Sequence, residues 1–142
     1  MNSQSAEVVR IDIPATYKHL SIVSACITEI IERTEDVDER KELIYNLQLA
    51  VHETCANIVE HAYEGQSEGR IAVTLTLFSH PRQLCVDLQD TGQSFDVFAV
   101  PDPDLSQPQV SGYGLFLIRH LVDEVTYTPG STYNCWRLIK FF

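Results

Sequence analysis

The chain is short of positive charge. Its 142 residues include 10 Lys and Arg against 20 Asp and Glu, which gives a net charge of -10 at pH 7. Proteins that bind nucleic acid directly need clustered cations to meet the phosphate backbone, so this composition argues against DNA or RNA as a ligand. A basic protein surface is a more suitable partner for such a chain.

Long apolar stretches are missing as well. No run approaches the roughly 20 residues that cross a bilayer, and no basic segment followed by an apolar one opens the chain. We therefore expect no membrane span, no signal peptide and a cytoplasmic location. The cysteines, which form no C-x-x-C pair, are then expected to be buried thiols. They are Cys26, Cys55, Cys85 and Cys135.

Three familiar ligand-binding motifs are absent. There is no G-x-x-x-x-G-K-[ST] phosphate loop, and no G-x-G-x-x-G fingerprint follows a strand. His52 and Glu53 begin the zinc-protease pattern H-E-x-x-H, but its fifth position is Ala56. His61 lies about 180° from His52 around a helix, so these two imidazoles cannot share a zinc ion.

What the sequence does contain is enough for one domain over residues 1–142. With 44% hydrophobic residues, a chain of this length can bury one core but not two. Hydrophobic periodicity predicts strands at 7–13, 70–78, 84–88, 124–128 and 133–142, and helices at 15–34, 38–63 and 115–122. Hairpin-paired strands with helices on one face make a two-layer α/β sandwich with a mixed, mostly antiparallel sheet.

The longest predicted helix carries polar residues that suit phosphate and metal chemistry. Glu53, Asn57 and His61 are spaced i, i+4 and i+8, which places them on one side of an α-helix. A carboxylate and an amide one turn apart offer oxygen atoms to a hard cation or a proton. A solvated helix edge explains the same spacing, and His61 could equally contact a phosphate or close the helix. The positions expected to face the core are Leu43, Leu47, Ala50, Val51, Thr54 and Ile58.

Two later stretches add to this pattern. Asp90 ends a predicted strand and is followed by Gly92, so its carboxylate could accept a hydrogen bond from an exocyclic amine; an ordinary turn is the alternative. Gly112 and Gly114 precede the last predicted helix, where glycine lets backbone N–H groups approach a phosphate closely, or merely caps the helix. Between these stretches, residues 93–111 are polar and proline-rich and are expected to form a lid.

Taken together, the three stretches resemble the nucleotide-binding boxes of the ATPase superfamily shared by gyrase, the 90-kDa heat-shock chaperone, histidine kinases and mismatch-repair proteins. Within it, the segments HETCANIVEHAY, DTGQSFD, GYGLFLIRHLVDEVTY and NCWRLIK are similar to the anti-sigma-factor serine kinases of the RsbW type. The resemblance extends from about residue 7 to residue 140. It implies the histidine-kinase-like ATPase (Bergerat) fold.

The resemblance also implies roles for individual residues, with ATP and Mg²⁺ as cofactors. Glu53 would be the general base, Asn57 the magnesium ligand, and Asp90 the residue that binds the adenine amino group. The further cofactor-binding positions are His61, Gly92, Gly112, Tyr113, Gly114 and Leu115. Tyr113 stands where relatives often have a basic residue, and residues 91–111 contain no Lys or Arg, which leaves the catalytic rate open.

The implied function is an ATP-dependent serine/threonine protein kinase that acts as an anti-sigma factor in a partner switch. It would phosphorylate a small anti-anti-sigma antagonist protein, bind a sigma factor, and form a homodimer. One alternative is a nucleotide-sensing binding module with little or no kinase activity. Another is a detached histidine-kinase catalytic domain, although the chain lacks a dimerisation helix pair with a phosphoacceptor histidine.

Overall fold

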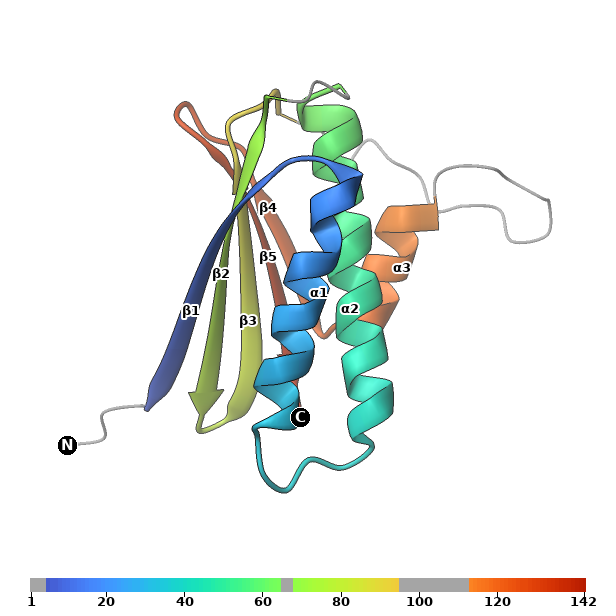
Figure 1. Cartoon of the computed structure of the whole chain (residues 1–142), viewed down its shortest axis with the longest axis vertical. Coiled ribbons are helices and arrows are strands. Elements are labelled where there is room, and N and C mark those ends of the chain that lie inside the picture. Colours follow the sequence, from blue (N-terminus) through green and yellow to red (C-terminus); the bar gives the residue numbers. More distant parts are fainter. Residues whose placement is uncertain (1–4, 65–67, 95–112) are drawn as a thin grey trace.

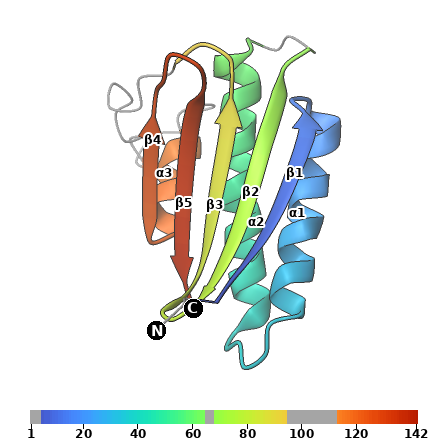
Figure 2. The same cartoon turned by 90° about the vertical axis from the view of Figure 1, so that its left-hand side faces the viewer.

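The computed structural model describes residues 5–64, 68–94 and 113–142, and in it three helices cover one face of a five-stranded sheet. Figures 1 and 2 show that the opposite face carries no helix from this part of the chain. The strand order is β1-β2-β3-β5-β4, and each described pairing is antiparallel. The expected two-layer sandwich is confirmed. Its elements are β1 (Ala6–Pro14), α1 (Tyr17–Glu32), α2 (Arg40–Asn57), η1 (Ile58–Ala62), β2 (Arg70–Ser79), β3 (Arg82–Asp90), α3 (Tyr113–Leu121), β4 (Glu124–Thr128) and β5 (Asn134–Phe141).

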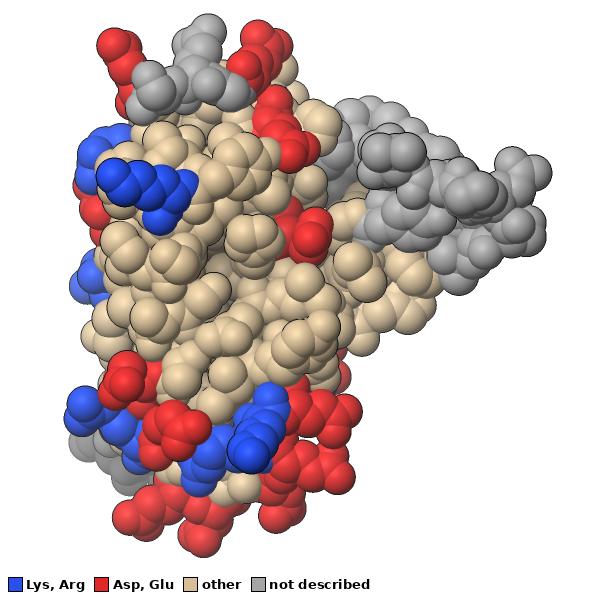
Figure 3. Space-filling model, turned by 45° about the vertical axis from the view of Figure 1, so that its right-hand side comes forward, with Lys and Arg blue, Asp and Glu red and all other residues tan. Residues whose placement is uncertain are grey.

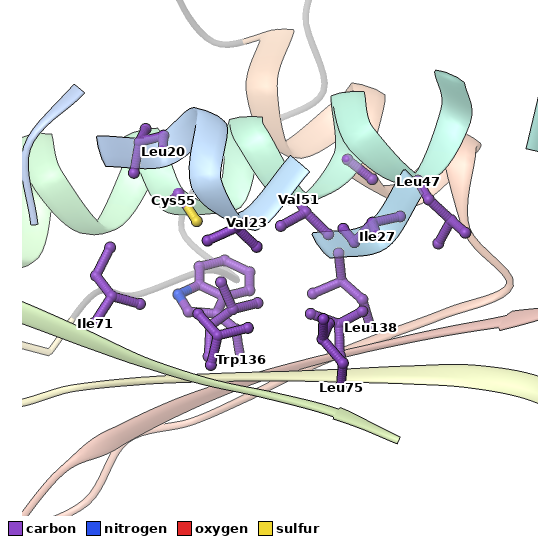
Figure 4. Packing of buried hydrophobic residues seen from close by; sticks show 14 of the residues in the cluster. Leu20, Val23, Ile27, Leu47, Val51, Cys55, Ile71, Leu75, Trp136 and Leu138 are labelled. Atoms are coloured by element: carbon purple, nitrogen blue, oxygen red, sulfur yellow. The ribbon is translucent and has the colours of Figure 1, made fainter. Parts of the chain in front are cut away.

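The core lies between the helices and the sheet. Every third or fourth residue of α1 is buried, which is the spacing of one helical face. All six α2 and η1 residues expected to face the core are buried too. Across from them, Trp136 and Leu138 of β5 fill the space between the layers (Figure 4). No helix of the described residues is long and apolar enough to span a membrane.

The helix ends differ from the expected positions for local reasons. α1 begins at Tyr17 because Thr16 has an extended backbone, and the Thr16 hydroxyl is paired with His19 Nδ1 at 2.7 Å instead of capping the helix. α2 begins at Arg40 because Glu39, with φ of 49°, occupies the left-handed region and cannot belong to a right-handed helix. At its other end, α2 stops at Asn57 and continues as the π-helix η1.

At the end of β3 opposite Asp90, the side chain of Arg82 connects three segments of the chain. Arg82, at the start of β3, donates hydrogen bonds to the carbonyl oxygens of Glu35 and Asp36 at 2.9 Å and of Phe142 at 3.1 Å. Its guanidinium also lies 4.9 Å from the centre of the Phe142 ring. The α1–α2 connection, the β2–β3 turn and the end of β5 are thereby joined.

Charge and sulfur are distributed unevenly. Residues 19–28 of α1 and 43–52 of α2 contain no Lys, Arg, Asp or Glu, and Figure 3 shows an uncharged band over the helices with charged side chains toward both ends. All four cysteines are free thiols, as expected, but only Cys55 and Cys85 are buried; Cys26 and Cys135 are half-buried.

Candidate nucleotide-binding site

Glu53 and Asn57 meet the first turn of α3. A methyl group placed on Gly114 would lie 3.0 Å from Glu53 Oε2 and 3.6 Å from Asn57 Oδ1, so glycine allows this close approach. Within the described ranges, neither polar side chain has a hydrogen-bond partner, which leaves their oxygen atoms available to a cation, a water molecule or a substrate hydroxyl. The structure thus brings together residues that are about sixty positions apart in the chain.

The other predicted residues of this half of the site are placed differently. Tyr113 is the first residue of α3, whereas Gly112 and residues 95–111 of the expected lid lie outside the described residues. Leu115 buries its side chain in the core, so only its backbone could take part in binding. His61 is exposed in η1, and the α-helical spacing that aligned it with Asn57 is altered by the π-turn. The roles of these residues stay predictions.

The π-helix η1 connects Glu53 and Asn57 to the part of the site around Asp90. The backbone N–H of Gln93 donates to the Ala62 carbonyl at 2.9 Å, and its side-chain amide donates to the His61 carbonyl, also at 2.9 Å. A methyl group on Gly92 would lie 2.3 Å from the Ala62 oxygen, closer than any real contact. Gly92 is therefore required for the close approach of the β3 end to η1.

Asp90 is buried at the end of β3, with 2% of its surface exposed. Its Oδ1 accepts hydrogen bonds from Gly92 N and from Asn134 Nδ2, both at 3.0 Å. Burial raises the pKa of the Asp90 carboxyl, and the two hydrogen bonds oppose that rise. Among the described residues no hydrogen bond reaches Oδ2, so this oxygen can accept one from a ligand.

Asn134 was not predicted as part of the site. It lies directly opposite Asp90 in the β3–β5 pairing and is 1% exposed. A signal for it exists in the sequence, because Asn134 shares the inward-facing register of Trp136 and Leu138 at the start of a strand. A polar residue in that register must find buried partners.

The side chains near Glu53 and Asn57 limit which kind of metal ion could bind there. No group of three or more His, Cys, Asp or Glu side chains that could hold a metal ion occurs in the described part of the chain. The amide of Asn57 beside the Glu53 carboxylate offers hard oxygen ligands, which fit a magnesium ion that takes its remaining ligands from phosphate and water.

A cavity of about 560 Å³ lies elsewhere, on the sheet face without helices. Its walls include Asp87, Arg137 and Cys135, and none of the predicted site residues lines it. It therefore adds nothing to the nucleotide-binding assignment.

Comparison with known proteins shows the family to which the chain belongs. The family model described as "Histidine kinase-like ATPase domain" matches residues 13–140. A protein named serine-protein kinase RsbW from Bacillus velezensis is 30% identical over 137 residues, covering 91% of this chain and 82% of the relative. The protein of the same name from Bacillus subtilis is 27% identical, covering 85% and 78% respectively.

Solved structures show the same fold. The RsbU and RsbW domains of a Mycobacterium tuberculosis protein superpose with a TM-score of 0.67 at 22% identity; 95% of this chain is covered, and it spans 32% of that chain. A blue-light-activated histidine kinase domain from Erythrobacter litoralis gives 0.55 at 23% identity, covering 90% of this chain and 61% of that one. The chain belongs to the histidine kinase-like ATPase family and, within it, to the RsbW-type serine-protein kinases.

Proposed function

We propose that this chain transfers the γ-phosphate of ATP to a serine or threonine of a small anti-anti-sigma antagonist protein. By this transfer it would act as the anti-sigma factor of a partner switch. The observation that carries the proposal is the convergence of Glu53, Asn57 and the Gly114 backbone at the start of α3. A helix N-terminus attracts phosphate, and a carboxylate and an amide beside it can serve the attacking hydroxyl and the metal.

Glu53 is the proposed general base. Its Oε2 faces the first turn of α3, where the triphosphate would bind, so it could accept the proton of the substrate hydroxyl as the phosphoryl group is transferred. Asn57 is the proposed magnesium ligand, and the ion would supply charge neutralisation at the phosphates. Phosphoryl transfer needs little covalent participation from the protein, so a positioned base and a metal suffice.

Asp90 is the proposed adenine-recognition residue. Its Oδ2 has no partner among the described residues and lies on a buried carboxyl group fixed by Gly92 and Asn134. An ionised carboxylate accepts but cannot donate, which favours the 6-amino group of adenine over the 6-oxo group of guanine. Gly92 would contribute through its backbone, because its N–H holds Asp90 Oδ1 and the space beside its Cα is filled by the Ala62 carbonyl.

The RsbW-type family works by partner switching. For this chain we propose the antagonist protein and a sigma factor as the two partners, a homodimer as the working unit, and the cytoplasm as the compartment, since sigma factors act where transcription occurs. The net charge of -10 supports binding to basic partner surfaces.

The deciding experiment is a phosphotransfer assay with labelled ATP, Mg²⁺ and candidate antagonist proteins. Acid-stable phosphoserine or phosphothreonine on the antagonist supports the proposal. Nucleotide-dependent binding without transfer would instead favour the sensing module, and acid-labile phosphohistidine would favour a histidine-kinase domain. Omission of Mg²⁺ is the control, because the proposed chemistry requires the ion.

A further inference from the structure

Every hydrogen-bonding position of the Asn134 amide is occupied. Its Nδ2 donates to Asp90 Oδ1 and to the Gly92 carbonyl, both at 3.0 Å. Its Oδ1 accepts from Ser94 Oγ at 2.9 Å and from Gly130 N at 3.3 Å. An amide has two N–H donors and two acceptor lone pairs, so nothing remains for a ligand. With 1% of its surface exposed, Asn134 acts on neighbouring groups rather than on a nucleotide.

The four bonds join three segments around Asp90. Asp90 ends β3, Gly92 and Ser94 follow it, and Gly130 belongs to the β4–β5 turn. That turn is tight, because a methyl group on Gly130 would lie 2.3 Å from the Tyr133 carbonyl oxygen. A single side chain thus fixes both loops beside the proposed adenine-binding carboxylate.

The bonds also decide which carboxylate oxygen faces a ligand. Gly92 N and Asn134 Nδ2 both donate to Oδ1 of Asp90, which holds the carboxyl group in one rotational position. The described residues leave Oδ2 without a donor. This difference between Oδ1 and Oδ2 depends on Asn134. Without its Nδ2 group, Oδ1 would accept only the hydrogen bond from Gly92 N.

We infer that Asn134 is a positioning residue for base specificity: it orients Asp90 so that Oδ2 meets the exocyclic amine of adenine and not the carbonyl of guanine. This inference rests on the proposed adenine-nucleotide site and names the residue that sets its selectivity. Asn134 makes no contact with the nucleotide in this scheme.

The pKa of Asp90 also supports a positioning role for Asn134. Burial raises the pKa of Asp90, and two hydrogen bonds lower it. The bond from Asn134 has the larger effect and the bond from Gly92 N the smaller. Replacing Asn134 by alanine should move this pKa further up, so Asp90 would lose its acceptor character at a higher pH. The nearby titratable groups on other elements are the Cys135 thiol on β5, whose pKa is raised chiefly by burial, and the Tyr63 phenol, which accepts from Thr91 N.

The test compares three binding constants in wild type, Asn134→Ala and Asn134→Thr: Mg-ATP, Mg-GTP and Mg-tripolyphosphate, measured by calorimetry from mildly acidic to mildly alkaline pH. We expect Asn134→Ala to bind ATP about tenfold more weakly at neutral pH, with tripolyphosphate affinity nearly unchanged. Its ATP affinity should also begin to fall at a higher pH than in wild type. Titration of the phosphates is common to all three proteins, so it cancels in the comparison.

Asn134→Thr keeps one hydroxyl donor, so its ATP affinity should lie between those of wild type and Asn134→Ala. It also provides a testable variant if Asn134→Ala does not fold. Arg82→Ala, a change at the far end of the sheet, controls for lower stability alone and should leave both ATP affinity and the pH profile as in wild type. Equal losses for ATP and tripolyphosphate, or an unshifted pH profile in both Asn134 variants, would overturn the inference. A wild type that does not prefer ATP to GTP would instead remove the proposed adenine site, and the inference with it.

Discussion

The two ends of β3 are each held by one polar side chain, but only the Asp90 end is proposed to bind a ligand. At the start of the strand, Arg82 donates to three backbone carbonyls and covers the Phe142 ring. At its end, Asn134 supports Asp90, whose Oδ2 lacks a donor among the described residues. The hydrogen bonds of Arg82 contribute to stability, whereas the raised pKa of the Asp90 carboxyl indicates that its ionised form lowers stability at neutral pH.

The largest effect is expected within the site, from Glu53→Gln. An amide cannot take a proton, so phosphoryl transfer should fall by on the order of 10³-fold while nucleotide affinity is retained. The matched control is Glu60→Gln, two turns further along, where Glu60 accepts a hydrogen bond from the Tyr17 hydroxyl. A single-turnover assay with labelled ATP separates the two variants. Equal rates for Glu53→Gln and wild type would show that Glu53 is not the base.

The next prediction separates affinity from stability at the ligand-binding end. Asp90→Asn keeps an oxygen that can accept from Gly92 N but replaces the acceptor Oδ2 by a donor, so ATP affinity should fall about tenfold or more while tripolyphosphate affinity is unchanged. Burial raises the folded-state pKa of Asp90, so the ionised carboxylate opposes folding at neutral pH. The variant should therefore have the higher Tm at neutral pH, and the difference should shrink as the pH falls and wild-type Asp90 becomes protonated.

Asp87→Asn is the control for this pair of effects, because Asp87 lies on the same strand but pairs with Arg137 at 2.7 Å on the open face. It should leave the preference for ATP over GTP unchanged. Thermal unfolding gives the Tm, and calorimetry the nucleotide affinities, of wild type, Asp90→Asn and Asp87→Asn. A lower Tm for Asp90→Asn would contradict the view that this end of β3 is maintained at a cost in stability.

Periodicity was sufficient for most elements because their hydrophobic faces are local features. The α1 stripe and the alternation of β2 follow directly from residue spacing. The π-turn at 58–62 was not predictable in this way, since its carbonyls are held by Gln93, thirty residues further on. The start of α2 was displaced by Glu39, whose left-handed backbone no propensity rule favours.

The site residues can also be separated into those that a local pattern predicted and those that depend on long-range packing. Glu53 and Asn57 were marked by helical spacing, but their meeting with Gly114 depends on how α3 packs on α2, which only the family resemblance implied. Asn134 was missed because its importance depends on the β3–β5 register that places it opposite Asp90. A local sequence window shows that Asn134 is a polar residue in an inward-facing register, but it does not show which residue of another strand lies opposite.

The smallest effect is expected at the far end, from Arg82→Ala. Losing three hydrogen bonds to carbonyls and the contact with the Phe142 ring should lower the free energy of unfolding by about 2 kcal/mol, because the carbonyls of Glu35 and Asp36 must then find water. Arg33→Ala is the control: the Arg33 side chain is 80% exposed and its ion pair with Glu29, at 3.4 Å, should contribute less than about 0.5 kcal/mol. Urea unfolding gives both values, and ATP titration should give the wild-type affinity for each variant. A loss of ATP affinity in Arg82→Ala would mean that the two ends of β3 are coupled, and the division into a stabilising end and a ligand-binding end would then fail.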